Sequence, residues 1–483
     1  MASAVNYRRV VEAVLAVAAS SVLLYFGNGL EPMWPLMWVA FLPLLWFALR
    51  SPWWEAACVT VFSMLLGSLN IWSYLTKTLH MPGSMWWEFF SVIAIVFAVG
   101  VLLFRVLVLR GAVWSGLVAL PSLWVVAEYS RNFTTPHGSA GSLAYSQLKF
   151  LPFLQLASIT GPWGMTFVLL LFSSAVAMAL YLRSSDPKKA VRVIGAGAGV
   201  VALALVFGAV RLALPQGETV KVGLIASDVK GNGNVTEPGA DTERLFREYV
   251  SAAKKLTAQG ARAIVIPEKL GVTLEGKSQS TDEIMQSLAN ETGATVVAGV
   301  VHVDAQVKYN EARVYEPAVA SVMRYDKEHM LPPFESNLKP GTTLVLLPRQ
   351  KQLWGVAICK DMDFADPARR YGKEGAGLLL VPAWDFVVDR SWHGHIAVMR
   401  GVEDGFSIAR AAKRGWLTVS DDRGRIVGEV SSSAAPFATL LVDVPAEHSW
   451  TLYQVLGDWF AWSAIVALVF VLIPLIRTRR PTV

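Results

Sequence analysis

The 483-residue sequence has a marked shortage of charged side chains. They make up 17% of the chain, against about 25% in an average soluble protein. The deficit is concentrated in residues 1–214, which are almost continuously apolar, whereas residues 216–450 have an ordinary globular composition. The sequence therefore excludes one large water-soluble core and predicts a membrane domain joined to a water-soluble domain.

Cysteine is also scarce, with only Cys58 in an apolar run and Cys359 in the more polar half of the chain. This scarcity excludes a disulfide framework, and we do not expect these two positions to pair. A lone thiol is either inert packing or a reactive group, and its surroundings decide between the two.

The formal net charge is +6, but the surplus Lys and Arg residues occur in short tracts beside apolar segments. Charges in such places are typical of membrane-topology signals. The sequence has no basic stripe interleaved with aromatic residues, the pattern of a nucleic-acid binder. We therefore expect membrane lipids, and no nucleic acid, among the partners.

A helix needs about 20 apolar residues to cross the hydrocarbon core of a bilayer. Eight segments meet this requirement approximately, at residues 9–27, 33–49, 54–75, 86–109, 112–130, 161–182, 191–214 and 457–476. Because further spans follow the first at once, we interpret the first as an uncleaved helix, not a signal peptide. The predicted domains are 1–214 with seven spans, 215–450, and 451–483 with the eighth span and a basic tail.

Positive charge predicts the orientation of these spans, since Lys and Arg gather on the cytoplasmic side. With the N-terminus inside, the cytoplasmic segments hold Arg8, Arg9, Arg50, Arg105, Arg110, Arg183, Lys188, Lys189, Arg192, Arg477, Arg479 and Arg480. The opposite loops hold only Lys77, Arg131 and Lys149. Residues 215–456 are therefore predicted to lie outside, which in a bacterium is the periplasmic face of the inner membrane.

The polar domain alternates strand and helix patterns, which indicates an α/β fold with sheets covered by helices. Expected strands are 221–227, 263–267, 294–303, 314–325, 353–358, 377–382, 407–411, 417–420 and 438–444. Expected helices are 242–258, 282–292, 365–374 and 391–401.

Three chemically active residues follow apolar runs that we expect to be strands: Glu268, Lys327 and Cys359. Strand ends in α/β proteins are common positions for ligand sites. Glu268 can take the proton of the thiol, which must ionise to attack a carbonyl. Lys327 and the backbone N–H of Lys360 can then stabilise the oxyanion. The pattern predicts acyl transfer through a covalent acyl-cysteine.

The three residues, in this order, resemble the Glu-Lys-Cys triad of the nitrilase (carbon–nitrogen hydrolase) superfamily. With seven spans before and one after, the whole chain resembles the bacterial apolipoprotein N-acyltransferases. The resemblance extends through residues 142–147, 154–161, 329–335, 383–385 and 399–410. It implies a polytopic helical membrane domain of about eight helices and a nitrilase-like αββα sandwich.

The resemblance also implies an activity and its partners. An acyl chain would pass from a phospholipid donor, through a thioester on Cys359, to the α-amine of a lipid-modified apolipoprotein, with no cofactor or metal. Glu335 would hydrogen-bond the lysine and position the amine, although taken alone it is equally typical of a surface salt bridge. Asp361 stands where these enzymes usually carry Glu, so the resemblance implies a supporting role in the site. The alternative is that Asp361 only begins a turn.

The chain departs from the usual pattern at two positions, with Lys360 where an aromatic residue is usual and Ile266 where Trp is usual. Two alternatives therefore stay open: a membrane-anchored amidase or N-acyltransferase for another amine or amide, and a non-catalytic scaffold. We interpret the glycines of 195–199 as close helix packing. His393 and His395 lie two apart on a predicted helix, which favours packing or solvent exposure over a metal pair.

Overall fold

The computed structural model describes residues 7–229, 239–277, 279–305, 307–319 and 321–476. The chain divides into two compact units. The helical unit comprises the described parts of 1–134, 141–212 and 456–483, and the α/β unit comprises 135–140 and 213–455. Each unit is described by itself.

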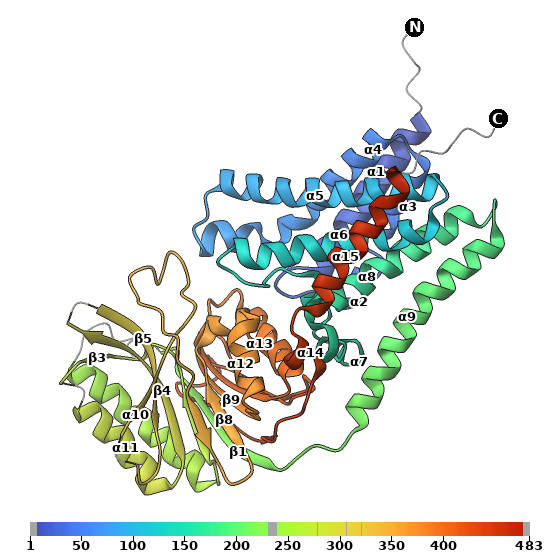
Figure 1. Ribbon diagram of the computed structural model, residues 1–483. Coiled ribbons are helices and arrows are strands. Elements are labelled where there is room, and N and C mark those ends of the chain that lie inside the picture. The colour runs from blue at the N-terminus through green and yellow to red at the C-terminus, as the bar shows by residue number, and fades with distance from the viewer. Residues whose placement is uncertain (1–6, 230–238, 278, 306, 320, 477–483) are drawn as a thin grey trace. The chain divides into compact units, whose positions relative to one another are not determined.

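The helical unit contains a helix at each of the eight predicted spans (Figure 1). The helices are α1 (Tyr7–Gly27), α2 (Trp34–Met37) with α3 (Leu42–Arg50), α4 (Trp53–Gly67), α5 (Gly83–Leu109), α6 (Val113–Thr134), α8 (Ala157–Leu182), α9 (Pro187–Ala213) and α15 (Trp459–Ile476). Shorter turns are η1 (Ser68–Ile71), η2 (Tyr74–Thr78), η3 (Leu143–Gln147) and α7 (Leu151–Leu154).

Five of these helices in the described part of the chain are long and apolar enough to cross a membrane. They are α1, α4 extended by η1, α5, α8 and α9, and two further apolar helices, at Trp34–Arg50 and Trp459–Leu475, are shorter. The remaining predicted span, α6, is 22 residues long but carries the acidic Glu128. Eight is therefore an approximate count of spans.

Glu128 is buried at 2% exposure, which is unusual for a carboxylate among apolar helices. It accepts hydrogen bonds from Trp124 Nε1 (3.0 Å), Ser142 Oγ (2.7 Å), Leu143 N (2.9 Å) and Thr166 Oγ1 (2.9 Å). These bonds offset the cost of burying the carboxylate and fasten the start of η3 to α6 and α8.

The predicted close packing at the 195–199 glycines holds at one position. A Cβ on Gly197 would lie 2.6 Å from Ala175 Cβ of α8, whereas Gly195 and Gly199 have nothing within 4 Å. A closer approach occurs further along α9, because Gly208 lies against the backbone of Pro152. Only a residue without a side chain fits there.

The α/β unit contains two sheets (Figure 1). The first has the order β13-β1-β2-β4-β5-β6, with β3 also paired to β4. Its strands are β1 (Thr219–Ala226), β2 (Ala263–Ile266), β3 (Val272–Leu274), β4 (Thr295–Asp304), β5 (Val307–Tyr315), β6 (Met323–Asp326) and β13 (Ala438–Pro445). The second runs β12-β11-β10-β9-β8-β7. Its strands are β7 (Leu346–Pro348), β8 (Leu353–Val356), β9 (Leu378–Trp384), β10 (Ser407–Lys413), β11 (Trp416–Ser420) and β12 (Ile426–Ser431).

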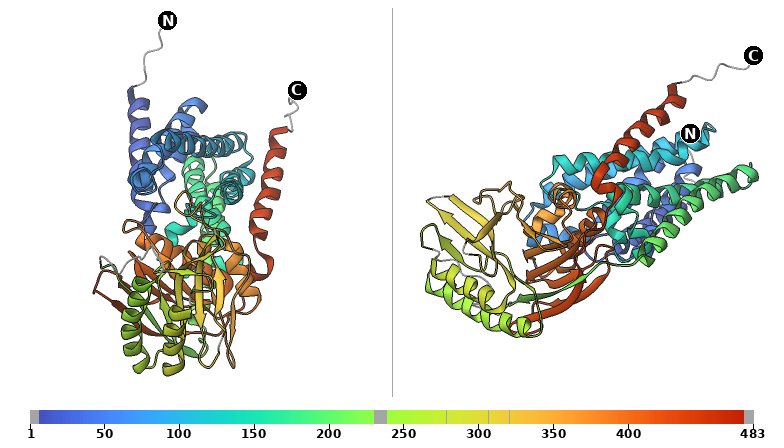
Figure 2. Two further views of the ribbon diagram at one scale, coloured as in Figure 1. Left: turned by 90° about the vertical axis from the view of Figure 1, so that its left-hand side faces the viewer. Right: turned by 60° about the horizontal axis from the view of Figure 1, so that its bottom comes forward.

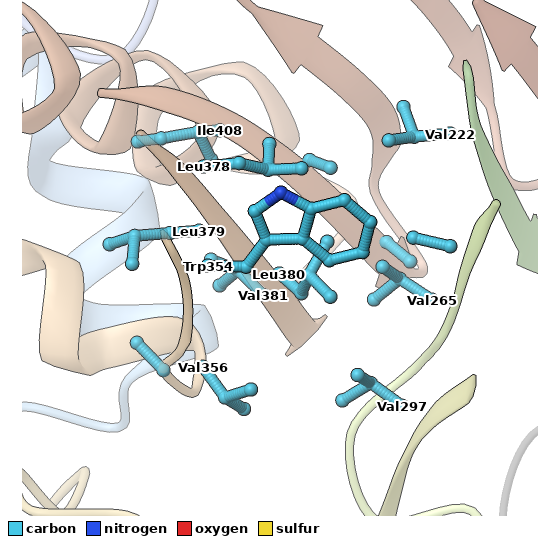
Figure 3. Close-up of a cluster of buried hydrophobic side chains, with 14 of the residues drawn as sticks. Val222, Val265, Val297, Trp354, Val356, Leu378, Leu379, Leu380, Val381 and Ile408 are labelled. Carbon is cyan, nitrogen blue, oxygen red and sulfur yellow. The ribbon is translucent and has the colours of Figure 1, made fainter. Parts of the chain in front are cut away.

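The two sheets pack face to face through a shared apolar core. In Figure 3, Val265 and Val297 of the first sheet face Leu380 of the second, with the Trp354 indole between them. On the outer side of the first sheet lie α10 (Ala240–Ala258) and α11 (Gln279–Thr292), the yellow-green helices of Figure 2. The second sheet is accompanied by η4 (Cys359–Asp363), α12 (Ala365–Lys373), α13 (Arg390–Asp404) and α14 (Leu452–Leu456). The order of layers is the expected αββα sandwich.

Two sequence-based predictions need correction. The single strand predicted at 314–325 is wrong: β5 ends at Tyr315 and β6 begins at Met323, antiparallel to it. Pro317 and the positive φ of Ala318 (60°) lie in the connection between them. Residues 135–140, predicted to belong to the membrane domain, belong to the α/β unit.

Candidate active site

Strand ends deliver the three predicted residues to one place. Glu268 follows β2, Lys327 follows β6, and Cys359 follows β8 and begins η4. Lys327 Nζ lies 2.9 Å from Glu268 Oε1, and the charges of both groups act on the thiol of Cys359. Glu268 and Lys327 are almost completely buried, whereas Cys359 is partly exposed. The arrangement places a partly exposed cysteine beside a buried ion pair.

Lys327 lies between two carboxylates, because Glu335 Oε2 is 2.8 Å from its Nζ. Burial alone would lower the pKa of Lys327, but Glu268 and Glu335 outweigh it and hold that pKa well above its ordinary value. The same pairing, together with Lys269, overcomes the effect of burial on Glu335 and lowers its pKa to about 2. Since Glu335 is 1% exposed, its alternative interpretation as a surface salt bridge is wrong.

Two further residues complete this charged cluster and were not predicted as parts of a site. Asn310 of β5 donates from Nδ2 to Glu268 Oε1 (2.5 Å) and to Glu335 Oε1 (2.8 Å). Lys269 Nζ lies 2.5 Å from Glu335 Oε1. The sequence signal for Asn310 is a lone amide in a strand that is buried from that residue onward.

Cys359 has a backbone φ of +42°, which is uncommon for a residue with a side chain. Burial and the carboxylate of Glu268 raise the pKa of its thiol, while Lys327 and Arg410 act in the opposite direction. The thiol donates to the carbonyl oxygen of Trp384 (3.6 Å). The neutral thiol is thus the resting form, and its ionisation requires transfer of the proton to a nearby base.

A second cation lies close to the sulfur. Arg410 Nη2, on β10, is 3.9 Å from Cys359 Sγ, and the guanidinium binds Asp385 at 2.8 Å and 2.5 Å. Both residues lie in stretches that the sequence marked as similar to the family, but neither was assigned a role. The sequence signal for a role of Arg410 was its position as a single arginine within the apolar run of β10.

Asp361, predicted as a supporting residue or the start of a turn, is fully buried and accepts four hydrogen bonds. The donors are Tyr325 OH (2.8 Å), Glu328 N (3.0 Å), His329 N (2.8 Å) and Ile358 N (3.1 Å). These bonds join the chain around Cys359 to the chain that follows Lys327. Asp361 therefore fixes the relative positions of the nucleophile and the lysine.

The side chain of Lys360 is buried and directed at Asp363, with Nζ 3.5 Å from Asp363 Oδ2. The same aspartate binds His393 Nδ1 (3.1 Å), whose Nε2 lies 3.3 Å from Asp389. The interpretation of His393 as simple packing or solvent exposure is therefore wrong. Among the described residues, no group of three or more His, Cys, Asp or Glu side chains is arranged to hold a metal ion.

Comparison with known proteins shows which families the chain is similar to. Residues 20–175 match the model of the apolipoprotein N-acyltransferase N-terminal domain, and residues 236–455 match that of the carbon–nitrogen hydrolases. An apolipoprotein N-acyltransferase from Geobacter metallireducens is 26% identical over 93% of both chains. One from Haemophilus influenzae is 25% identical over 96% of this chain and 95% of its own. The chain is thus similar to apolipoprotein N-acyltransferases over nearly its full length.

The two matched regions correspond largely to the two units of the structure, residues 20–175 to the helical unit and residues 236–455 to the α/β unit. Among solved structures, the chain is similar to a nitrilase-superfamily amidase from Nesterenkonia AN1. That match is 20% identical over 48% of this chain and 93% of that one, with a TM-score of 0.41. Nit3 of Saccharomyces cerevisiae, from branch 10 of the superfamily, is 18% identical over 47% and 91%, with a TM-score of 0.40.

Proposed function

We propose that this chain N-acylates lipoproteins by moving a fatty acyl chain from a phospholipid to the α-amine of a diacylglyceryl-cysteine apolipoprotein. The observation that carries the proposal is the buried Glu268–Lys327–Glu335 cluster beside a partly exposed Cys359. It occurs in a chain that matches the family over nearly its full length. Cys359 is the nucleophile, Glu268 the general base and acid, and Lys327 the main cation facing the oxyanion.

Acylation begins when Glu268 takes the Sγ proton of Cys359 as the sulfur attacks the ester carbonyl of the phospholipid. A base next to the sulfur is needed because the thiol's pKa is raised, which disfavours a free thiolate. The oxyanion of the tetrahedral intermediate is stabilised by Lys327, which keeps its charge, and by the N–H of Lys360. When the C–O bond breaks, Glu268 returns the proton to the leaving alcohol, and a lysophospholipid departs.

The second half-reaction runs through the same groups. The neutral α-amine attacks the thioester carbonyl and gives a proton to Glu268, and the C–S bond breaks. Cys359 regains its proton from Glu268, and the amide product leaves. Asn310 and Lys269 hold Glu335 and Glu268 in place during both steps. Two half-reactions through one thioester give ping-pong kinetics.

Both substrates are held at a bilayer by their own acyl chains, which suits an enzyme with several apolar helices. The distribution of Lys and Arg supports an inner-membrane location with the α/β unit in the periplasm. Triacylated lipoprotein is the product expected on that side.

The test uses purified full-length protein in mixed micelles, phosphatidylethanolamine with a labelled acyl chain, and a diacylated lipopeptide. The parent should produce triacylated lipopeptide, and mass spectrometry should find one acyl adduct on Cys359 when the acceptor is omitted. Cys359→Ser should lower turnover about 10³-fold or more, since it removes the nucleophilic thiol. Cys58→Ser, the matched change at the other free cysteine, should leave turnover unchanged.

Other results would contradict the proposal. Ammonia release from small amides without labelling by phospholipid would identify an amidase. Equal behaviour of the parent and Cys359→Ser in every assay would identify a non-catalytic scaffold.

A further inference from the structure

A short segment of the chain, residues 135–140, belongs to the α/β unit although the residues on both sides of it belong to the helical unit. It contacts η4, the turn that begins with Cys359. Ser139 donates from both its backbone N and its Oγ to the carbonyl oxygen of Asp363, each at 3.3 Å. Gly138 lies directly against the same carbonyl, where a Cβ would be only 2.6 Å away.

The side chains make a second set of contacts between the segment and η4. Lys360 Nζ donates to His137 Nδ1 at 3.3 Å. Burial and the ammonium of Lys360 lower the pKa of His137 to about 4, so the ring is neutral and can accept this bond. The ammonium also approaches Asp363, whose carboxylate binds His393 of α13. The segment therefore closes a network that includes the residue next to the nucleophile.

The start of η4 has a conformation that needs such support. Cys359 has a φ of +42°, and residues with side chains keep a strained backbone only where the surroundings over-determine it. Asp361 secures one side of η4 to the chain after Lys327. Asp363 is the anchor on the other side, and its carbonyl and carboxylate are contacted by Ser139 and His393.

We propose that residues 137–139 are a positioning element for the nucleophile. By holding the Asp363 end of η4, they keep Cys359 in its strained conformation and keep the N–H of Lys360 directed at the reacting carbonyl. They do not touch substrate. The inference deepens the proposed function, because it names the device that makes Cys359 competent for attack.

The test compares a glycine inside this segment with one directly after it. Gly138 (φ +53°) and Gly141 (φ +83°) both have backbone conformations that alanine adopts with strain. A Cβ at Gly138 would displace the Asp363 carbonyl, whereas a Cβ at Gly141 would meet only Arg131, at an ordinary 3.5 Å. Gly138→Ala and Gly141→Ala therefore share the backbone cost and differ in their effect on η4. Ser139→Ala, which removes one hydrogen bond to Asp363, serves if Gly138→Ala fails to fold.

Each full-length variant is acylated by labelled phosphatidylethanolamine and, separately, by a p-nitrophenyl ester that needs no lipid recognition. We expect Gly138→Ala to slow the limiting rate of Cys359 acylation by both reagents at least tenfold, with the half-saturating phospholipid concentration unchanged. Ser139→Ala should slow it several-fold, and Gly141→Ala should remain within twofold of the parent. A rise in the half-saturating concentration alone, or equal rates for the two glycine variants, would overturn the proposal.

The two reagents separate this inference from the proposed function. If phospholipid acylates none of the variants but the p-nitrophenyl ester still distinguishes Gly138→Ala from Gly141→Ala, the positioning role stands and the donor assignment fails. If phospholipid acylates all variants equally, the donor assignment stands and the positioning role fails.

Discussion

At the scale of single residues, the site depends on how buried charges are paired. Glu268, Lys327 and Glu335 are each at most 2% exposed, and an unpaired charge at that depth would be very costly. Two carboxylates and one ammonium leave an excess of negative charge, which Lys269 reduces by pairing with Glu335. Asn310 adds donors without adding charge. This balance keeps Glu268 hydrogen-bonded and next to the thiol from which it must take a proton.

Asn310→Ala should slow acylation of Cys359 about 10- to 100-fold. The substitution removes hydrogen bonds to two carboxylates, and a bond to a charged group contributes about 1.5–3 kcal/mol. Asn310→Asp should be slower still, because it places a third carboxylate beside Glu268 and Glu335. Single-turnover acylation by labelled phospholipid measures both effects. The control is Lys308→Ala, at an exposed position of the same strand; an Asn310→Ala rate within twofold of the parent would contradict the bridging role.

At the scale of elements, the nucleophile turn η4 is held by α13 as well as by the chain after β6. His393 of α13 lies between Asp363 and Asp389. Burial alone would lower the pKa of His393, but the two carboxylates outweigh it and raise that pKa to about 10. The histidine is therefore a charged tie between α13 and η4 at neutral pH.

This tie predicts a loss of stability at alkaline pH. Below pH 6.5 both the folded and the unfolded chain hold the proton, and the stabilisation is complete. Between about pH 6.5 and 10 the unfolded chain loses the proton first, so the contribution of His393 falls as pH rises. In thermal unfolding of detergent-solubilised protein from pH 7 to 10, His393→Gln should show a smaller decline in Tm than the parent.

His448→Gln is the control, because burial lowers the pKa of His448, so its contribution does not change above pH 7. Its Tm profile should parallel that of the parent. Parallel profiles for the parent and His393→Gln would show that the ion pairs with Asp363 and Asp389 do not form.

The same scale shows what the sequence could predict. For long elements with a clear hydrophobic period, such as α10 and β4, the predicted bounds agree with the observed bounds within a few residues. The connection between β5 and β6 was missed although Pro317 breaks that run, and the three-residue strands β3 and β7 are too short to show a period. β12, mostly half-exposed at the edge of its sheet, has no apolar face to detect. Contacts such as Asn310 with Glu335 or Ser139 with Asp363 join distant segments, and no local pattern encodes them.

At the scale of the whole molecule, chain connectivity constrains the topology. Residues 135–140 follow five predicted spans and the start of the main α/β segment at 213 follows seven, so an odd number precedes each. Both segments then fall on the same side of a membrane, which agrees with their membership in one compact unit. The eight-span arrangement satisfies this condition, and loss of either α8 or α9 as a span would violate it, because these two helices lie between the segments.

The distribution of Lys and Arg predicts on which side of the membrane the two segments lie. The structure shows that one of these residues, Arg105, also has a structural role. Arg105 lies within α5 and donates to the carbonyl oxygens of Ala48 and Ser51, so it is partly a structural residue. Arg477, Arg479 and Arg480 lie outside the described residues. The bias is nevertheless preserved by Arg50, Arg110 and the basic residues between α8 and α9.

The orientation can be measured with single cysteines in a Cys58→Ser, Cys359→Ser background. Arg244→Cys places a thiol at a half-exposed position of α10, and Ser184→Cys places one on the exposed turn between α8 and α9. In bacterial cells with a permeabilised outer membrane, an impermeant maleimide should label Arg244→Cys at once. It should label Ser184→Cys only after the inner membrane is disrupted, because the Lys and Arg residues around that turn predict a cytoplasmic location. Labelling of Ser184→Cys alone in intact spheroplasts would place the α/β unit in the cytoplasm, away from the acceptor lipoproteins that the proposed reaction requires.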